Sequence, residues 1–385
     1  MKLLFLQSGN YAEAWTRLRD GGPEDYRDQR ASVDVVSALA EQHDVLIVST
    51  MGGPYQTELA PGLRAIGLAE GEVWRSDVVE KLAEAERPDL IFCRTVHRGL
   101  LGWARRHDVP TLASFADLFA NDSLRALYRN ARLGLLLRGR NFPCVANHSL
   151  NASRSLSQAL LYPKNRIVPW DWSRLPVDPQ PRTSVTDPAN PVLMFAGMLI
   201  ETKGVGDCLQ AVALLRDQGR RVTLRLAGKG DIDGWKARAA GLGIADRVEF
   251  LGLIPHDEVR RRMRESDMVV VPSHHAYAEG LPNVIYEALA TRTPLILSDH
   301  PSFAGRLREG EQCLTFPEGD GAALAGLISR VTDDAKLFAT LSLAGAAAHE
   351  QLYVGMKLTA LMTTFIGDPR NETGWVARNS LAALR

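Results

Sequence analysis

Residues 270–290 read VVPSHHAYAEGLPNVIYEALA and carry the most informative pattern in the chain. An apolar strand ends at Pro272, a polar loop follows, and a helix is expected from Pro282 through Glu287. Pro282 suits the first helical turn, where its missing N–H removes no hydrogen bond. The free N–H groups of that turn and the helix dipole form a site for an anion, and Gly280 lets the backbone approach it closely. The stretch therefore predicts a strand-loop-helix unit with a place for a diphosphate; an ordinary strand-loop-helix with two solvated glutamates is the alternative.

Short apolar runs alternate with helix-like segments on both sides of this stretch. Such alternation argues for parallel sheets covered on both faces, which predicts the α/β class with two Rossmann-like parallel-sheet domains. In the first half the expected strands are Leu3–Leu6, Val45–Ser49, Leu90–Cys93, Thr111–Phe115 and Cys144–Ala146. In the second half they are Val192–Ala196, Thr223–Ala227, Val248–Leu251, Met268–Val271, Leu295–Leu297 and Leu314–Phe316.

Prolines cluster between Val168 and Pro191, in the middle of the chain. Proline fixes φ and removes a donor, so this stretch is expected to be neither a central strand nor a helix interior. We therefore expect an N-terminal domain over residues 1–170, a linker over 171–190 and a C-terminal domain over 191–364. In open α/β sheets ligands bind beyond the carboxyl ends of the strands, which suggests a ligand cleft between the domains.

The composition excludes several classes of protein. The 385 residues hold 45 basic and 45 acidic side chains, so no net charge draws the chain to nucleic acid. The cysteines lie far apart, at Cys93, Cys144, Cys208 and Cys313, which fits a reducing compartment and no zinc ribbon. The apolar run near the N-terminus is too short for a signal peptide, and no stretch approaches the roughly 18 apolar residues of a membrane span. We expect a cytoplasmic protein, with association on the cytoplasmic face of a membrane as an open alternative.

Three glycine loops follow strands of the second half. They read FAGMLIETKG at 195–204, LAGKG at 226–230 and RVEFLG at 247–252. Lys203, flanked by Gly204, is a plausible phosphate contact, although an isolated lysine is more often simply solvated. Each loop is a weak signal alone, and their order along the chain gives them weight.

Together, these segments resemble the retaining GT-B glycosyltransferases called group 1 or family 4. The resemblance covers about residues 191–333. Its strongest part is Glu279 and Glu287, with seven residues between them in EGLPNVIYEALA, followed by PLILSD at 294–299. It implies two domains facing across a cleft, and sugar transfer with retention from a nucleoside-diphosphate donor to a hydroxyl acceptor. It also implies that the segment at about 365–385 packs back on the first domain, with Trp375 and Val376 as anchors.

The resemblance also implies roles for individual residues. Glu287 would bind the ribose, Glu279 the sugar hydroxyls, and Lys203 the diphosphate. One cation and preorganised N–H donors would then stabilise the leaving group without a metal or other cofactor. The implied catalytic set is Glu279, Lys203, His97 and Asp117. The implied donor-binding set is Gly197, Lys203, Gly228, Leu251, Gly252, Ile254, Gly280, Leu281, Pro282, Asn283 and Glu287, and Gly21 and Gly22 would form a glycine loop of the first domain.

The chain departs from the family pattern at several of these places. Met198 stands where an arginine is common, so a neighbour such as Arg306 or a residue of the first domain would have to replace that cation. Ala116 stands where a histidine is expected, whereas Asp117 remains. His97 is read either as a cleft residue or as an ordinary surface or capping histidine. Gly21-Gly22 is read either as a phosphate-approaching loop or as a plain turn.

The acceptor side is expected in the first domain. Residues 125–140 read RALYRNARLGLLLRGR, with five arginines and no acid. Such a segment suits an anionic membrane or a lipid-diphosphate acceptor, and a core-packed helix with a solvated basic face is the alternative. The expected partners are a nucleotide sugar of the UDP or GDP type and a carbohydrate, lipid-linked or small-molecule acceptor.

Two rival functions stay open. A degenerate protein that binds a nucleotide sugar without turnover would explain Met198 and Ala116. A nucleotide-sugar epimerase or a phosphorylase-like enzyme on the same fold would need acid and base groups on the sugar, and no convincing pair is visible. The His274-His275 pair could suggest a metal, but no third ligand at suitable spacing is visible.

Overall fold

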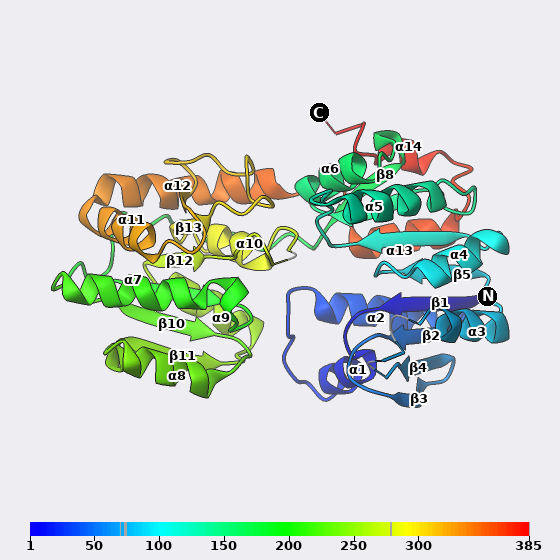
Figure 1. Ribbon diagram of the computed structural model, residues 1–385, viewed down its shortest axis with the longest axis horizontal. Helices are drawn as coiled ribbons and strands as arrows, with labels where there is room; N and C mark the ends of the chain where they lie inside the picture. The colour runs from blue at the N-terminus through cyan, green and yellow to red at the C-terminus, as the bar shows by residue number, and fades with distance from the viewer. Residues whose placement is uncertain (70, 73–74, 278, 385) are drawn as a thin grey trace. The chain divides into compact units, whose positions relative to one another are not determined.

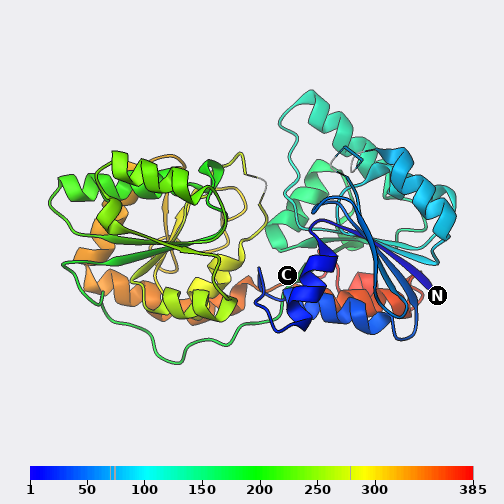
Figure 2. The same ribbon diagram turned by 90° about the horizontal axis from the view of Figure 1, so that it is seen from below.

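The computed structural model describes residues 1–69, 71–72, 75–277 and 279–384. The chain divides into two compact units, which are coloured in sequence order in Figures 1 and 2. Unit 1 comprises Met1–Ser173 and Val354–Arg385, and unit 2 comprises Arg174–Tyr353. Each unit has its own parallel sheet with helices packed on both faces, which confirms the predicted fold class.

Over the described residues, unit 1 is built on a nine-stranded sheet with the order β15-β8-β7-β6-β5-β1-β2-β4-β3. Its strands are β1 (Lys2–Gln7), β2 (Asp44–Ser49), β3 (Tyr55–Ala60), β4 (Leu63–Gly67), β5 (Leu90–Cys93), β6 (Thr111–Phe115), β7 (Val145–His148), β8 (Ile167–Asp171) and β15 (Met356–Lys357). Its helices are α1 (Tyr11–Arg19), α2 (Gln29–Leu39), α3 (Ser76–Glu86), α4 (Arg98–Arg106), α5 (Leu124–Leu136), α6 (Leu150–Ala159), α13 (Leu358–Gly367) and α14 (Trp375–Arg378). The pairing is parallel except between β3 and β4.

The described part of unit 2 is built on a six-stranded parallel sheet with the order β11-β10-β9-β12-β13-β14. Its strands are β9 (Val192–Ala196), β10 (Thr223–Ala227), β11 (Val248–Gly252), β12 (Met268–Val271), β13 (Leu295–Ser298) and β14 (Leu314–Phe316). Its helices are α7 (Val205–Asp217), α8 (Ile232–Gly241), α9 (His256–Arg264), α10 (Asn283–Ala290), α11 (Gly321–Asp333) and α12 (Ala335–Leu352).

The apolar runs form strands because parallel strands are covered on both faces. All four residues of β12 are buried, and so are all four of β5. In unit 1 the stacked rings of Phe5 and Phe92, with centroids 4.3 Å apart, anchor one face of the central strands. Every run expected to be a strand coincides with one to within a residue or two, the normal uncertainty of element ends.

Side chains cap several helices at their first turn. Each accepts a hydrogen bond from a backbone N–H three residues later and so satisfies a donor that the helix leaves unpaired. The caps are Asn10 of α1, His97 of α4, Ser123 of α5, Asp231 of α8, Asp320 of α11 and Asp334 of α12.

The prediction that no central strand lies after Val168 is wrong, because β8 runs through Pro169 between β7 and β15. The carbonyl of Trp170 accepts from the N–H of Ser149, so this residue faces β7. Backbone direction alternates along a strand, so Pro169 faces the other side. On that side β15 pairs only with Trp170 and Asp171, so the N–H group that Pro169 lacks is not needed for strand pairing.

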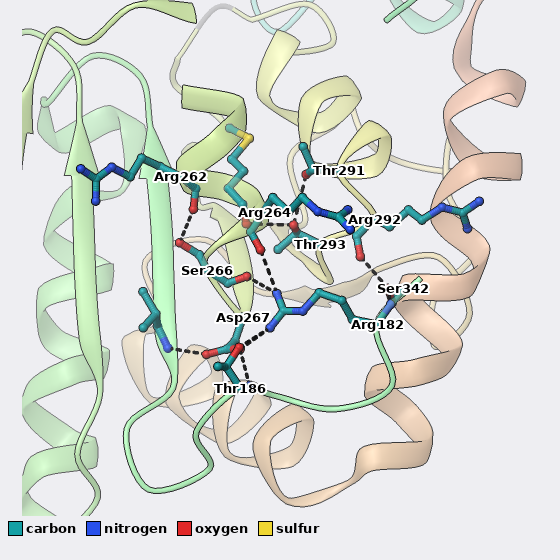
Figure 3. Close-up of polar contacts among 12 residues, drawn as sticks. Arg182, Thr186, Arg262, Arg264, Ser266, Asp267, Thr291, Arg292, Thr293 and Ser342 are labelled. Atoms are coloured by element: carbon teal, nitrogen blue, oxygen red, sulfur yellow. Dashed lines mark hydrogen bonds and ion pairs between the residues drawn. The ribbon is translucent and has the colours of Figure 1, made fainter. Parts of the chain in front are cut away.

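The linker expected over 171–190 is largely an ordered part of unit 2. The carboxylate of Asp267 is almost fully buried and accepts from the N–H groups of Thr186 and Val192, at 2.8 and 2.9 Å. Figure 3 shows the Arg182 guanidinium beside it, 2.6 Å from Asp267 and also bonded to the Ser266 carbonyl. Two backbone N–H groups and one guanidinium satisfy the buried charge of Asp267. They hold the segment around Arg182 and Thr186 against unit 2.

The chain returns to unit 1 at Val354, earlier than the expected position near 365. Figure 1 shows α13 in the same unit as β5 and α4, although it lies near the end of the sequence. Phe365 packs edge-on against Phe92, with ring centroids 5.2 Å apart. Trp375 and Val376, the expected anchors, are both buried in the same core.

Candidate functional site

The three glycine loops of unit 2 meet at the carboxyl ends of β9, β10 and β11. The N–H of Gly197 donates to the carbonyl of Ala227 at 2.9 Å, and the N–H of Gly228 donates to the carbonyl of Gly252 at 2.8 Å. Gly228 has φ +143°, and a Cβ there would collide with the Gly197 carbonyl, so the loops approach this closely only with glycine. The sequence placed these loops on one edge of the sheet, and the structure brings them into direct contact.

Lys203 and Glu279 form an ion pair at this edge. Their side chains are 12% and 10% exposed, and the Lys203 ammonium also lies 4.4 Å from the centre of the Tyr277 ring. Gly204 follows Lys203 with φ +75° and packs against the carbonyl of Pro272, which holds the β9 loop against the end of β12. The lysine of the first glycine loop and the first glutamate of EGLPNVIYEALA therefore lie side by side.

Glu279 keeps one carboxylate oxygen available for a ligand. Its Oε1 pairs with Lys203, whereas its Oε2 is buried and has no hydrogen-bond partner among the described residues. Buried polar atoms are normally hydrogen-bonded, so an acceptor left open in this position points to a donor group that arrives with a ligand. Hydroxyl groups of a sugar are donors of that kind.

The loop that carries Glu279 is braced by the segment after β13. The hydroxyl of Ser302 donates to the Glu279 carbonyl, and His300 Nε2 lies 3.0 Å from the Tyr277 carbonyl. His300 Nδ1 accepts from the N–H of Ser302 at 3.1 Å, so the ring is neutral with its proton on Nε2. Burial lowers the pKa of His300, which favours this neutral form. Neither His300 nor Ser302 was predicted from the sequence.

Glu287 lies on the buried side of α10, beside the loop after β11. Its Oε1 is 3.4 Å from Nδ1 of His256, the first residue of α9. Leu251 and Gly252 end β11, and Ile254 lies on the connection from β11 to α9. The predicted ribose contact, Glu287, is therefore adjacent to this part of the predicted donor-binding set. His256 contacts Glu287 and was not predicted from the sequence.

The start of α10 adds further groups to this edge. Pro282 is the residue before the helix and Asn283 is its first residue. The side-chain oxygen of Asn283 is buried and has no hydrogen-bond partner among the described residues. Leu281 is buried beneath the helix start, next to Gly280. The backbone N–H groups of this turn lie in sequence directly after Glu279, as an anion site at a helix N-terminus requires.

The two neighbouring histidines have separate carboxylate partners. His274 Nε2 lies 2.8 Å from Asp207 of α7, and His275 Nε2 lies 2.9 Å from Asp299. His275 Nδ1 is also 3.3 Å from Glu318. These pairs tie the loop after β12 to α7 and to the segments after β13 and β14. Over the described part of the chain no group of three His, Cys, Asp or Glu side chains is placed to hold a metal ion.

The position of the missing arginine is open at the surface. The Met198 side chain is 51% exposed beside Gly197. Arg306, suggested as a replacement cation, donates to the carbonyl of Leu352 at 2.8 Å. Its guanidinium is therefore engaged with the backbone that precedes the return to unit 1.

The residues expected in unit 1 take local structural positions. His97 is the cap of α4, with Nδ1 accepting from the N–H of Leu100 at 3.0 Å, and its ring is buried. Gly21 and Gly22 close the carboxyl end of α1, where Gly22 donates to the carbonyl of Arg17 at 2.8 Å. Of the expected set, Asp117 alone is an exposed side chain after a central strand, β6.

The glycine loop that directly follows β1 is a different one. Gly9 follows that strand with φ +90°, and Asn10 then caps α1. Gly21-Gly22, expected to form a phosphate-approaching loop or a plain turn, thus follows α1 and is not the loop at the end of β1. The reason is that α1 fills the stretch between β1 and these glycines, which the sequence reading did not assign as a helix.

A buried charged cluster at the ends of β7 and β8 was also missed. Asp171 lies 3.6 Å from the Arg27 guanidinium and 3.5 Å from His148 Nε2, and all three side chains are buried. The His148 ring lies against Trp170, with centroids 4.8 Å apart. Asp171 lies within the expected linker, where no sequence pattern predicts a structural carboxylate.

Comparisons with known proteins agree with this geometry. Residues 190–334, which hold the glycine loops and both glutamates, match the model of the family described as Glycosyl transferases group 1. The lipopolysaccharide core biosynthesis glycosyltransferase LpsE of Rhizobium meliloti is 28% identical over 346 residues, which span 87% of this chain and 91% of LpsE. The amylovoran biosynthesis glycosyltransferase AmsK of Erwinia amylovora is 29% identical, but the match spans only 36% of this chain and 35% of AmsK.

A solved structure extends the likeness in fold to both units. Alr3699/HepE of Anabaena in complex with UDP superposes with a TM-score of 0.64 and 18% identity, covering 96% of this chain and 99% of that one. At this identity the likeness concerns the fold alone. The chain thus has the GT-B fold, with two Rossmann-like units.

Proposed function

We propose that the chain is a group 1 glycosyltransferase, as the family match over residues 190–334 and the similarity to LpsE support. In this proposal it transfers a sugar from a nucleoside-diphosphate donor to a hydroxyl group of an acceptor. One observation carries the proposal: the Lys203–Glu279 pair lies between the glycine loops and α10, with an open carboxylate oxygen. A cation for phosphate and an acceptor for sugar hydroxyls in one small volume suit the two ends of a sugar–phosphate bond.

The donor in this proposal binds along the carboxyl edge of the unit 2 sheet. Glu287 accepts the ribose hydroxyls, and the backbone from Leu251 to Ile254 borders the base. Lys203 and the N–H groups at the start of α10 hold the diphosphate. UDP is the first nucleotide to test, since Alr3699/HepE is described in complex with UDP, and GDP is the second.

The proposed reaction breaks the bond between the anomeric carbon and the diphosphate oxygen. Negative charge grows on that oxygen, and Lys203 with the preorganised N–H donors stabilises it, the role that a metal ion has in other glycosyltransferases. The acceptor hydroxyl attacks the same face and gives its proton to the departing diphosphate oxygen, so the anomeric configuration is retained. Glu279 positions the sugar through its hydroxyls, and no residue is proposed as a covalent nucleophile.

The proposed acceptor side is unit 1, near Asp117. A carbohydrate, a lipid-linked glycan and a small molecule are the classes to test. We also propose contact with an anionic membrane through residues 125–140, whose basic side chains are exposed. Among the described residues no helix has the length and apolar character needed to cross a membrane. A cytoplasmic site of action is supported by the four cysteines, all of which are free and buried.

Nucleotide binding is the first test of this function. UDP, GDP and ADP are titrated calorimetrically into the full chain, with and without EDTA, and into Glu287→Gln. We expect one nucleotide to bind equally well in EDTA and much more weakly to the variant. Its sugar conjugate is then offered with acceptors of each class, and the anomeric coupling constant of the product is read by NMR. An inverted product would contradict retention, and loss of binding in EDTA would contradict metal independence.

A non-catalytic nucleotide-sugar binder is the second candidate, favoured by the exposed Met198 in place of a phosphate-binding arginine. This candidate predicts the same nucleotide binding in calorimetry. It also predicts no sugar transfer to any acceptor and no donor hydrolysis above the rate without protein. The two functions therefore separate at the turnover step.

A further inference from the structure

A groove of about 340 Å³ separates α4 and α5 on the surface of unit 1. Arg98, Gly102 and Arg105 line it from α4, and Arg132 with three leucines lines it from α5. Arg98 donates to the carbonyl of Arg129, and Arg105 donates to the carbonyl of Leu135 at 2.8 Å, so both α4 arginines lean across toward the other helix. The groove thus combines an apolar wall with guanidinium groups on both sides.

The positive charge around this groove is not neutralised by the residues that the structure describes. In the part of the chain that the structure describes, no carboxylate lies within ion-pair distance of the guanidinium groups at Arg98, Arg105, Arg125, Arg129, Arg132 and Arg138. By contrast, Arg106 on the same helix pairs with Glu80 at 2.5 Å. Partial burial lowers the pKa of Arg98, and the charges of Arg132 and Arg129 lower it further. The cluster is therefore under mutual repulsion that an anion would relieve.

An exposed apolar stripe runs along α5 next to the arginines. Leu124, Tyr128 and Leu135 lie on one face at spacings of four and seven residues, and they are 86%, 64% and 60% exposed. Arg125 and Arg129 each follow a member of this stripe by one residue, and Arg132 lies between Tyr128 and Leu135 at helical spacing. Large apolar side chains at this exposure, bordered by arginines, fit the boundary between headgroups and acyl chains of an anionic bilayer.

Gly102 is unexplained by the packing of the fold. It lies in the middle of α4, where glycine weakens a helix. A Cβ at this position would meet only Arg106 Nη1, at an ordinary 3.5 Å, so the fold itself leaves room for a side chain. Gly102 stands between Arg98 and Arg105 at helical spacing, and any larger side chain there would stand in the groove. The glycine keeps the groove open between its two arginines.

We propose that the α4–α5 groove binds the phosphate headgroup of an anionic lipid at a membrane surface. In this arrangement Arg98, Arg105 and Arg132 hold the phosphate, and the apolar stripe of α5 enters the acyl boundary. The inference deepens the membrane contact of the proposed function, since it names the ligand class and the site. It uses no residue of the nucleotide site in unit 2.

Vesicle binding of the full chain tests the inference. Sedimentation with vesicles of phosphatidylcholine alone is compared with vesicles that contain phosphatidylglycerol, without nucleotide. We expect binding only to the anionic vesicles. Arg132→Glu is expected to weaken it about 30-fold, since each basic residue at such a surface contributes about fivefold and the reversal adds repulsion. Lys336→Glu in α12 of unit 2, with the same change in charge, is the control and is expected to leave binding unchanged.

Gly102→Leu separates a groove from a merely charged surface. It retains every charge and adds apolar area, so a contact made by the surface alone would persist or strengthen. We expect binding to fall about tenfold, because the leucine occupies the space of the headgroup between two arginines. Gly102→Ala, which suits the helix, checks by circular dichroism and vesicle binding that the loss does not come from misfolding.

Three outcomes would overturn the inference. They are equal binding to neutral and anionic vesicles, full binding by Gly102→Leu, and full displacement from vesicles by millimolar inorganic phosphate at constant ionic strength. The last would assign the groove to free phosphate. Nucleotide titration of the same variants is run in parallel. Failure of UDP and GDP binding with vesicle binding intact refutes the proposed function alone, and the reverse refutes only the groove.

Discussion

The two units share one architecture, but their carboxyl sheet edges are used differently. In unit 2 the edge gathers the Lys203–Glu279 pair, the glycine loops and the buried Glu287. In unit 1 the expected His97 caps a helix and the expected glycines close one. Both edges follow from the same parallel topology. Topology therefore says where a site can be, and only the partners of each side chain say whether a residue is committed to the fold or left for a ligand.

The open acceptor atoms make this difference concrete. In unit 2 the atoms Oε2 of Glu279 and Oδ1 of Asn283 are buried with no partner among the described residues. In unit 1 the ring nitrogen Nδ1 of His97 already accepts from a backbone N–H. An acceptor that is already satisfied gains little from a ligand, whereas an open one gains a full hydrogen bond. The comparison predicts strong effects on function from changes in unit 2 and effects on stability alone from their counterparts in unit 1.

Loss of Lys203 is expected to have the largest effect. In Lys203→Met the leaving diphosphate loses its cation, and turnover is expected to fall about 10²–10³-fold, the usual result of removing one preorganised donor. Steady-state rates with saturating donor measure this. Lys236→Met, on the surface of α8, is the matched control and keeps its rate. A turnover rate of Lys203→Met within threefold of that of the original chain would contradict the proposal that the unit 2 edge is catalytic.

Glu287→Gln is expected to weaken nucleotide binding about 10–100-fold, because hydrogen bonds to a charged group contribute roughly 1.5–3 kcal/mol. The substitution keeps the shape of the side chain but removes its charge beside His256. Calorimetric dissociation constants measure the effect. Glu249→Gln on β11, whose carboxylate pairs with Arg225 at the surface, provides the control. If nucleotide binding weakened equally in both variants, the effect would come from the change in net charge, and Glu287 would not be shown to bind the nucleotide.

Acidification is expected to have a moderate effect through His300. Burial lowers its folded pKa below the unfolded value of about 6.5, so the unfolded state takes up the proton more readily. Its contribution to stability is therefore present above about pH 6.5 and is lost as the pH falls through the lower folded value. Protonation breaks the bond from Ser302 N–H to Nδ1 and so loosens the loop of Glu279. The Glu279 carboxylate favours the protonated ring, whereas the charges of His275 and Lys203 disfavour it.

Donor affinity measured between pH 8 and pH 5 tests this expectation. We expect a few-fold fall as the pH drops through the folded pKa of His300, which lies below 6.5, and no such fall in His300→Gln, whose amide cannot titrate. A fall of the same size in the variant would assign the pH effect to another group.

The fold was largely readable from the sequence because parallel strands buried on both faces appear as short apolar runs. This holds for β12 and β5, where every residue is buried. It fails for the β3–β4 hairpin, since no residue of β3 is buried and the strand therefore has no continuous apolar run. It also fails at β8, where Pro169 is harmless only because of the side it faces, a fact of pairing that no single stretch of sequence contains.

The site was readable in unit 2 for a different reason. Glu279 and Glu287 lie within one strand-loop-helix segment, so their spacing alone brings them to one edge. The sequence did not predict His256, His300 and Ser302. His256 precedes this segment, at the start of α9, and the other two follow β13, so all three join the site only through tertiary contacts. In unit 1 the position of His97 after β5 was read correctly, but whether its ring turns to the helix or to a ligand depends on one hydrogen bond.

The smallest effect on function is expected for His97→Ala, and it tests the comparison most sharply. Removal of a helix cap destabilises a protein by about 1 kcal/mol, here the bond from Leu100 N–H to the ring. Thermal unfolding is expected to shift down by roughly 2–4 °C, similarly to Ser123→Ala at the cap of α5. Nucleotide affinity and turnover are expected to stay within twofold. A tenfold loss of turnover with no shift in unfolding would make His97 a catalytic group, and the unit 1 edge would then be a second half of the active site rather than a structural counterpart.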